Sequence, residues 1–103
     1  MVMTMLEAQV PPERWDDLRA SYEARARLPE SGAILESFLI QGTENTSVWR
    51  IVTVWRDREA LEAMRSSGET PTGVLIFRDA EAQPRLTIFN VLANPRAAAA
   101  STP

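Results

Sequence analysis

Apolar and β-branched residues gather in four short stretches of the chain, at residues 2–10, 33–41, 47–55 and 85–93. Each stretch has the length and composition of a β-strand, and each is bounded by proline, glycine or a polar turn cluster. The stretches 33–41 and 47–55 flank a short polar turn, which predicts a β-hairpin.

The segment between the first two predicted strands has the periodicity of an amphipathic helix. Trp15, Leu18, Tyr22 and Ala26 share one face of a helix that runs from Pro12 to Leu28. Proline is tolerated in the first turn of a helix, and the proline directly after residue 28 stops it. This segment is therefore predicted to pack one apolar face against the sheet.

A second helix is predicted after the third strand. The side chain of Asp57 is placed to cap the first turn, because its oxygen can accept a hydrogen bond from a free backbone N–H group. Ala60, Leu61 and Met64 form the apolar face of this helix. We expect it to end near residues 66–68.

The stretch at residues 72–83 fits two interpretations. Its apolar run, Val74–Phe77, suits a short buried strand or one turn of helix, and periodicity alone does not decide between them. The helix-favouring residues that follow favour a short helix. The element order is then β-α-β-β-α-(α)-β, the split βαβ arrangement of ferredoxin-like folds. We predict an α+β fold with a four-stranded antiparallel sheet, one domain over residues 1–95 and a disordered tail over residues 96–103.

Both faces of the predicted sheet carry large apolar side chains. In the strand at 48–55, alternation separates Trp49, Ile51, Thr53 and Trp55 from Val48, Arg50, Val52 and Val54. In the strand at 33–41, alternation places Leu35 and Leu39 on one face and Ile34, Phe38 and Ile40 on the other. In the strand at 85–93, it places Leu86, Ile88 and Leu92 on one face and Phe89 and Val91 on the other. Helices cover only one face, and a second copy of the sheet is the natural cover for the other. We therefore expect a homodimer that forms through the open sheet face.

The composition excludes several classes of chemistry. The chain has no His and no Cys, and its 11 basic residues are all Arg. It therefore lacks Cys- or His-dependent nucleophile pairs, Cys-based metal sites and a Lys Schiff base. The glycine-rich signatures of dinucleotide and P-loop sites are also missing. We expect no metal and no cofactor.

The charge pattern bears on partners and location. The formal net charge is −3, whereas nucleic-acid-binding surfaces are basic. No apolar run is long enough to span a membrane, and the N-terminus lacks the basic region of a signal peptide. We expect a cytoplasmic protein with no nucleic-acid partner and no membrane association.

Residues 54–64, with the sequence VWRDREALEAM, resemble the strand-to-helix junction of the antibiotic biosynthesis monooxygenase family, whose fold is a dimeric α+β barrel. In that family a Trp ends the third strand, an acidic helix cap and Ala-Leu follow, and a His often comes next. The resemblance covers roughly residues 2–93. Met64 stands where the His is common, and the haem-degrading relatives use such a His on iron. The resemblance leaves open the cofactor-free oxygenases of aromatic polyketides, which it associates with Trp, Asn, Tyr and Arg around an apolar pocket.

Three residues are candidates for catalysis. Trp55 is expected either to line a pocket between helix and sheet or to pack in the core. Tyr22 is the only phenol of the chain and can donate a hydrogen bond to a ligand oxygen or to water. Asn90 interrupts an apolar face of the last strand, where a buried amide needs hydrogen-bond partners.

Three further residues are candidates for substrate binding. Trp49 shares a strand face with Trp55, and Met64 lies on the apolar face of the second helix. Arg50 is expected to form an ion pair with Glu7 or Glu36, or else to stabilise an enolate or carboxylate.

These residues support two hypotheses of function. The first is a cofactor-independent monooxygenase that acts on a small aromatic, polyketide-type substrate. Its carbanion reacts with oxygen directly, and the protein supplies a dry pocket, orientation and charge stabilisation. With no His, a carboxylate such as Glu7 or Glu36 would have to be the base, with a pKa raised by burial. The second hypothesis is a non-catalytic dimeric barrel that binds a small apolar molecule or serves a structural role.

Overall fold

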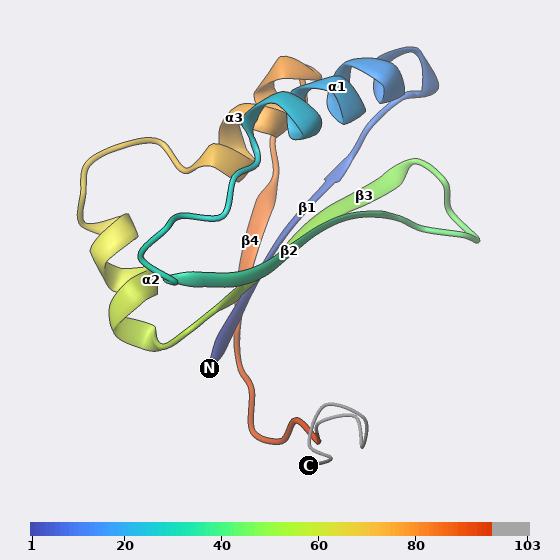
Figure 1. Cartoon of the computed structure of the whole chain (residues 1–103). Coiled ribbons are helices and arrows are strands. Elements are labelled where there is room, and N and C mark those ends of the chain that lie inside the picture. Colours follow the sequence, from blue (N-terminus) through green and yellow to red (C-terminus); the bar gives the residue numbers. More distant parts are fainter. Residues whose placement is uncertain (96–103) are drawn as a thin grey trace.

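The computed structural model describes residues 1–95. Its elements are β1 (Val2–Gln9), a 3-10 turn (Pro12–Arg14), α1 (Trp15–Arg25), β2 (Ile34–Gln41), β3 (Val48–Trp55), α2 (Arg58–Arg65), α3 (Thr72–Asp79) and β4 (Arg85–Asn90) (Figure 1). The predicted element order is confirmed, and the ambiguous stretch contains the short helix α3. The tail expected over residues 96–103 lies outside the described residues.

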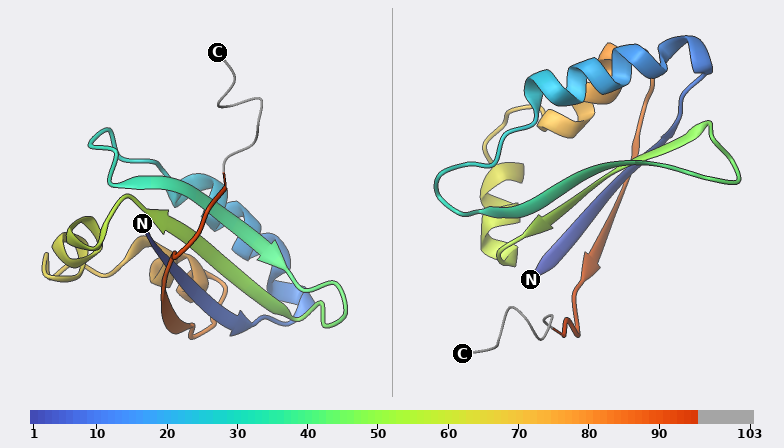
Figure 2. Two further views of the ribbon diagram at one scale, coloured as in Figure 1. Left: turned by 90° about the horizontal axis from the view of Figure 1, so that it is seen from below. Right: turned by 45° about the vertical axis from the view of Figure 1, so that its right-hand side comes forward.

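The four strands form one antiparallel sheet in the order β2-β3-β1-β4. The third strand lies between the first two, which is the split βαβ arrangement. The helices of residues 1–95 all lie on one face of the sheet, and within these residues the opposite face carries no helix (Figure 2). The predicted ferredoxin-like α+β fold is therefore confirmed.

Strand alternation places side chains as expected in β3, where Trp49, Ile51 and Trp55 are buried under the helices. The prediction for the start of β2 was wrong. A register irregularity between Ile34 and Glu36 aligns Ile34 with Trp55, so Ile34 lies on the covered face, and Leu35 is 46% exposed. An irregularity of one residue reverses the faces on either side of it.

Two elements are shorter than predicted. The helix α1 ends at Arg25, and Ala26 is already extended, with ψ at 124°. The Arg27 guanidinium donates to the carbonyl oxygens of Glu23 and Ala26 there, which satisfies helix-end acceptors as a basic residue near a C-terminus does. The strand β4 ends at Asn90, so Leu92 lies beyond the sheet and is 92% exposed.

The covered face of the sheet divides into two halves. The filled half lies under α1 and α3, where nine buried residues form one cluster that includes Trp49, Leu18 and Phe77. The other half lies beside α2, where the buried residues are Val2, Trp55, Ala60 and Leu61. We call it the cavity half, because it borders the cavity described below. Figure 1 shows α1 and α3 next to each other and α2 at one end of the sheet.

The open face of the sheet is rich in exposed apolar side chains. Phe38, Ile40 and Phe89 are 47%, 41% and 39% exposed, and the strand register places Val52 and Val54 between them. Within residues 1–95, no helix has the length and apolar character needed to cross a membrane.

Candidate functional site

A cavity of about 280 Å³ lies between the sheet and the helices, beside α2 and reaching the edge of the filled half at Ile51 and Ile76. All four strands contribute to its floor. Its walls come from the C-terminal end of α1, from α2 and from the segment that begins α3. Most of the lining is apolar. The cavity is therefore a space in which a small apolar molecule can be held away from water.

A row of hydroxyl groups crosses the floor of this cavity. Thr4, Thr53 and Ser37 are direct cross-strand neighbours on β1, β3 and β2, and all three line the cavity. We call these three residues the hydroxyl row. Side chains at such paired positions lie about 5 Å apart. The row therefore offers adjacent donors and acceptors to a polar edge of a ligand.

Two aromatic residues hold the ends of the hydroxyl row. The Tyr22 hydroxyl lies 2.8 Å from Ser37 Oγ and forms a hydrogen bond with it. The Trp55 Nε1 group donates to Thr4 Oγ1 over 3.0 Å. These bonds fix the two rings against the floor and leave the Thr53 hydroxyl with no side-chain partner among residues 1–95. The polar groups are thus oriented before any ligand arrives.

Two exposed arginines line the same cavity at its solvent side, Arg27 after α1 and Arg65 at the end of α2. The Arg27 Nη1 atom donates only to backbone carbonyl oxygens, at 3.2 Å and 2.7 Å. The Arg65 Nη1 atom lies 3.5 Å from Glu62 Oε1. The side of the cavity that faces water therefore carries positive charge.

The structure brings three of the six predicted site residues together. Trp55, Tyr22 and Met64 all line the cavity. Trp55 is 6% exposed and ends β3, so it both packs in a cluster and forms part of the cavity wall. Trp55 therefore combines the two expected positions, since it packs in the core and also lines the pocket.

Trp49 lies in the filled half rather than at the cavity. Its ring packs against Trp15 in an edge-on arrangement with centroids 5.9 Å apart. It is 5% exposed, and its Nε1 group has no hydrogen-bond partner within residues 1–95. Two tryptophans six positions apart on the same face of β3 thus differ, because one is packed in the core and the other borders a cavity.

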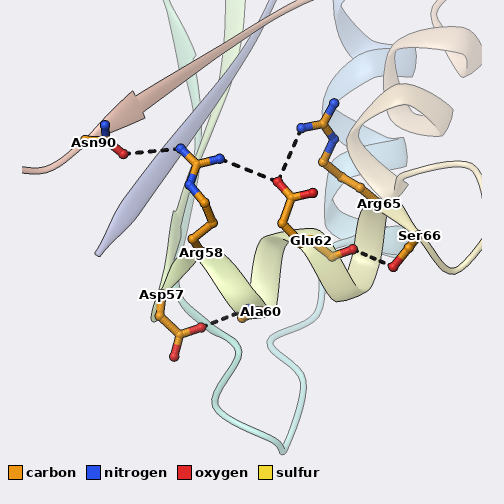
Figure 3. A network of polar contacts seen from close by, with 7 residues as sticks. All are labelled: Asp57, Arg58, Ala60, Glu62, Arg65, Ser66 and Asn90. Carbon is orange, nitrogen blue, oxygen red and sulfur yellow. Dashed lines mark hydrogen bonds and ion pairs between the residues drawn. The ribbon is translucent and has the colours of Figure 1, made fainter.

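Asn90 and Arg50 also lie outside the cavity lining. Asn90 is exposed rather than buried, and its side-chain oxygen accepts a hydrogen bond from Arg58 over 3.3 Å (Figure 3). Arg50 points to the open face of the sheet, where its Nε atom donates to Glu7 over 2.7 Å. The expected Arg50–Glu7 ion pair is confirmed.

Sequence patterns alone did not single out the hydroxyl row or the two arginines. A signal for the row existed, because Thr4, Ser37 and Thr53 each stand between apolar neighbours on their strand face. Finding the row required the strand register, which the irregularity in β2 shifts. Arg27 and Arg65 resemble any solvated helix residue until the cavity beside them is known.

The sequence also matches a known family of proteins. The model of the antibiotic biosynthesis monooxygenase family matches residues 1–71, which is most of the described chain. The chain belongs to this family.

Solved structures of other proteins share the fold. One of them is named as an antibiotic biosynthesis monooxygenase from Deinococcus radiodurans. Its alignment covers 94% of this chain and 98% of that protein, with a TM-score of 0.67 at 11% identity. The heme-degrader MhuD of Mycobacterium tuberculosis covers 93% and 100%, with a TM-score of 0.66 at 20% identity. Rv0793 of the same organism covers 92% and 98%, with a TM-score of 0.67 at 17% identity. No curated protein matches the chain in sequence.

This family member has no acidic side chain among the residues that line its cavity. Glu7 and Glu36, the carboxylates considered as a base, both lie on the open face of the sheet. Without a carboxylate or an imidazole, the lining holds no group that accepts a proton near neutral pH.

The two carboxyl groups with clearly shifted pKa values have structural surroundings. The backbone N–H of Ala60, and then Arg56, lower the pKa of Asp57, which caps α2. Arg25, and then the Ser21 hydroxyl, lower the pKa of Asp79. Asp79 thus stays ionised and ties α1 to α3. Within residues 1–95, no group of three or more acidic side chains is arranged to hold a metal ion.

Proposed function

We propose that this chain is a cofactor-independent monooxygenase that holds a small hydroxylated aromatic substrate in the cavity. The observation that carries the proposal is the apolar cavity floored by the hydroxyl row and bounded by Trp55. Its volume of about 280 Å³ is at the small end of ligand sites and suits a molecule of about two to three fused rings. The family membership supplies the reaction class.

The chemistry needs no metal or cofactor when the substrate is acidic enough. A ring methylene group, R₂CH₂, loses a proton to give a carbanion that is stabilised by the neighbouring rings. The carbanion transfers electrons to O₂, a C–O bond forms, and the resulting hydroperoxide loses water. The balance is R₂CH₂ + O₂ → R₂C=O + H₂O. The roles of the protein are exclusion of water, orientation and stabilisation of the developing oxyanion.

In this scheme the hydroxyl row and Tyr22 hold the substrate oxygens. The Tyr22 and Ser37 hydroxyls share one hydrogen bond of 2.8 Å, so one proton of the pair remains free to point at a ligand oxygen. Because the lining offers no base, the substrate loses its proton to water or hydroxide in solution and binds as the anion. The rate is then expected to rise with pH along the ionisation of the substrate and not along that of a protein group.

Oxygen uptake with a hydroxylated anthrone tests the proposal, with uncatalysed oxidation measured as the blank. We expect one O₂ consumed for each ketone formed. The Tyr22→Phe variant should lower kcat/KM about tenfold, because one hydrogen bond to the oxyanion is lost. The Thr87→Ser variant, on the opposite face of the sheet, is the matched control. Saturable binding with no oxygen uptake above the blank would reject catalysis.

A second candidate function is binding without reaction. The observation that favours it is the lack of any carboxylate or imidazole in the lining. It predicts that the protein binds hydroxylated aromatics saturably and leaves their oxidation rate unchanged at every pH.

We also propose that two copies pair through the open face of the sheet. Phe38, Ile40 and Phe89 would leave a large apolar patch in water on a single copy. Light scattering at micromolar concentration is expected to give twice the mass of the chain. The Phe38→Glu variant, which adds charge to this patch, is expected to give the mass of one copy. A single-copy mass for the unaltered chain would contradict the pairing.

A further inference from the structure

The charge around the cavity is opposite to that of the whole chain. The chain has 14 acidic and 11 basic residues and a net charge of −3. The 20 residues that line the cavity include two arginines, Arg27 and Arg65, and no acidic residue. An acidic protein therefore presents a positive entrance to this apolar cavity.

The charge of Arg27 is not neutralised by a carboxylate within the described residues. Its guanidinium donates to the carbonyl oxygens of Glu23 and Ala26, which carry no net charge. No acidic side chain of residues 1–95 lies within ion-pair distance of it. Two of its hydrogen-bonding directions are thus used to hold its place, and its positive charge remains available.

The charge of Arg65 is only partly neutralised. Glu62 Oε1 lies 3.5 Å from an Nη1 atom of Arg65 and 3.5 Å from one of Arg58, so a single carboxylate is shared between two guanidinium groups (Figure 3). Arg58 is held from its other side by Asn90. The group of Arg58, Glu62 and Arg65 therefore carries a net positive charge beside the cavity.

We propose that the cavity selects aromatic ligands that carry a carboxylate or an equally acidic oxygen. The rings lie in the apolar cavity, and the anionic group lies at its entrance with Arg27 and Arg65. This inference rests on the ligand site of the proposed function and deepens it to a ligand class. The proton of this acid group is distinct from the C–H proton of the proposed reaction, so the selection by charge does not depend on a base in the cavity.

A purely structural role of the two arginines makes a different prediction. Their aliphatic stems cover apolar surface at the cavity while the charged ends stay in water. In that case the charge of the ligand is irrelevant, and an uncharged analogue binds as well as an acid.

Calorimetry with naphthoate and naphthamide separates the two roles, because these probes differ in charge and share their rings. We expect naphthoate to bind about tenfold more tightly than naphthamide at low salt, with the preference reduced at high salt. Arg27→Gln and Arg65→Gln should each weaken naphthoate about threefold, and the double variant about tenfold, with naphthamide unchanged. Arg19→Gln, on the exposed side of α1, is the matched control and should change neither probe.

A third variant gives an effect of opposite sign. Glu62→Gln removes the one carboxylate that Arg58 and Arg65 share, so naphthoate should bind about two- to threefold more tightly. A partly unfolded variant cannot produce such a gain. Equal affinity of the two probes for the unaltered protein, with no effect of Glu62→Gln, would overturn the charge selection and leave the cavity as a ligand site. Binding of neither probe would overturn both this inference and the proposed function.

Discussion

The two halves of the covered sheet face differ in what they place beside a tryptophan of the same strand. In the filled half, Trp49 meets Trp15 and a cluster that includes Phe77, which is fully buried. In the cavity half, Trp55 meets Thr4 and an unfilled space. Since the strand and its covered face are shared, the difference comes from the helices.

The placement of the helices explains this difference. The helices α1 and α3 are tied to each other by Asp79, which accepts from Ser21 over 2.6 Å and from Arg25 over 2.7 Å. Near its start, α3 carries Gly73, where a Cβ atom would lie 2.5 Å from Leu6 Cδ1, so a larger residue here would require the Leu6 side chain to move. The helix α2 stands apart at the end of the sheet (Figure 1). Close packing stabilises one half, and the space left in the other is available for a ligand.

The largest expected effect separates the halves by stability. Phe77→Ala removes a fully buried ring from the filled half, and we expect a loss of about 3–5 kcal/mol in the free energy of unfolding. Met64→Ala, at the edge of the cavity, should cost less than about 2 kcal/mol, since its side chain already borders empty space. Urea denaturation measures both values. Equal losses would show that the two halves are packed alike.

A smaller effect separates the two faces of the sheet by ligand affinity. Thr53→Val removes the middle hydroxyl of the row while keeping its shape. We expect hydroxylated aromatics to bind about tenfold more weakly, the equivalent of one lost hydrogen bond. Thr87→Val makes the same change on the open face and should leave the affinity unchanged. Calorimetry measures the affinity of both variants. An equal loss of affinity in the two would argue against the row as a binding element.

The smallest expected effect concerns pH. The pKa of Asp79 in the folded chain is lowered from its unperturbed 3.8, first by Arg25 and then by Ser21. Its contribution to stability is therefore present above about pH 4 and is lost as the pH falls through the lower folded pKa. In thermal unfolding, Asp79→Asn should lower Tm by a few degrees near neutral pH, and the difference from the unaltered chain should vanish in acid.

The capping carboxylate gives the matched measurement for the cavity half. The pKa of Asp57 is lowered too, by the backbone N–H of Ala60 and by Arg56. Asp57→Ala should show the same pH dependence of Tm and should also weaken ligand binding, because α2 carries part of the cavity wall. Asp79→Asn should weaken binding less, because Asp79 joins α1 to the far end of α3 and does not itself line the cavity. Equal weakening in both variants would mean that the two halves are not independent.

The fold was predictable because its determinants are local and repeated. The alternation in β3, the Asp57 cap and the periodicity from Trp15 to Tyr22 each specify one element, and all three are found in the structure. Boundaries were less predictable. The register irregularity beside Ile34 depends on how β2 meets β3, and the end of α1 depends on where the Arg27 side chain finds acceptors.

The candidate site was predictable only where one residue carries a rare chemical group. Trp55 and Tyr22 stand out in the sequence as aromatic residues with polar ends, and both line the cavity. Asn90 was expected in a buried position and is exposed, because β4 is an edge strand whose end meets the solvated Arg58. The hydroxyl row is made of ordinary residues from three strands, so only tertiary pairing reveals it.

The most direct test of the account is a fluorescence titration with juglone, a non-fluorescent hydroxylated naphthoquinone. The chain has no cysteine and no lysine to react with this probe. We predict saturable quenching that is strongly reduced in Trp55→Phe and retained in Trp49→Phe, because only Trp55 borders the cavity. Quenching that survives in Trp55→Phe and is lost in Trp49→Phe, or that never saturates, would contradict the claim that the cavity half is the ligand site.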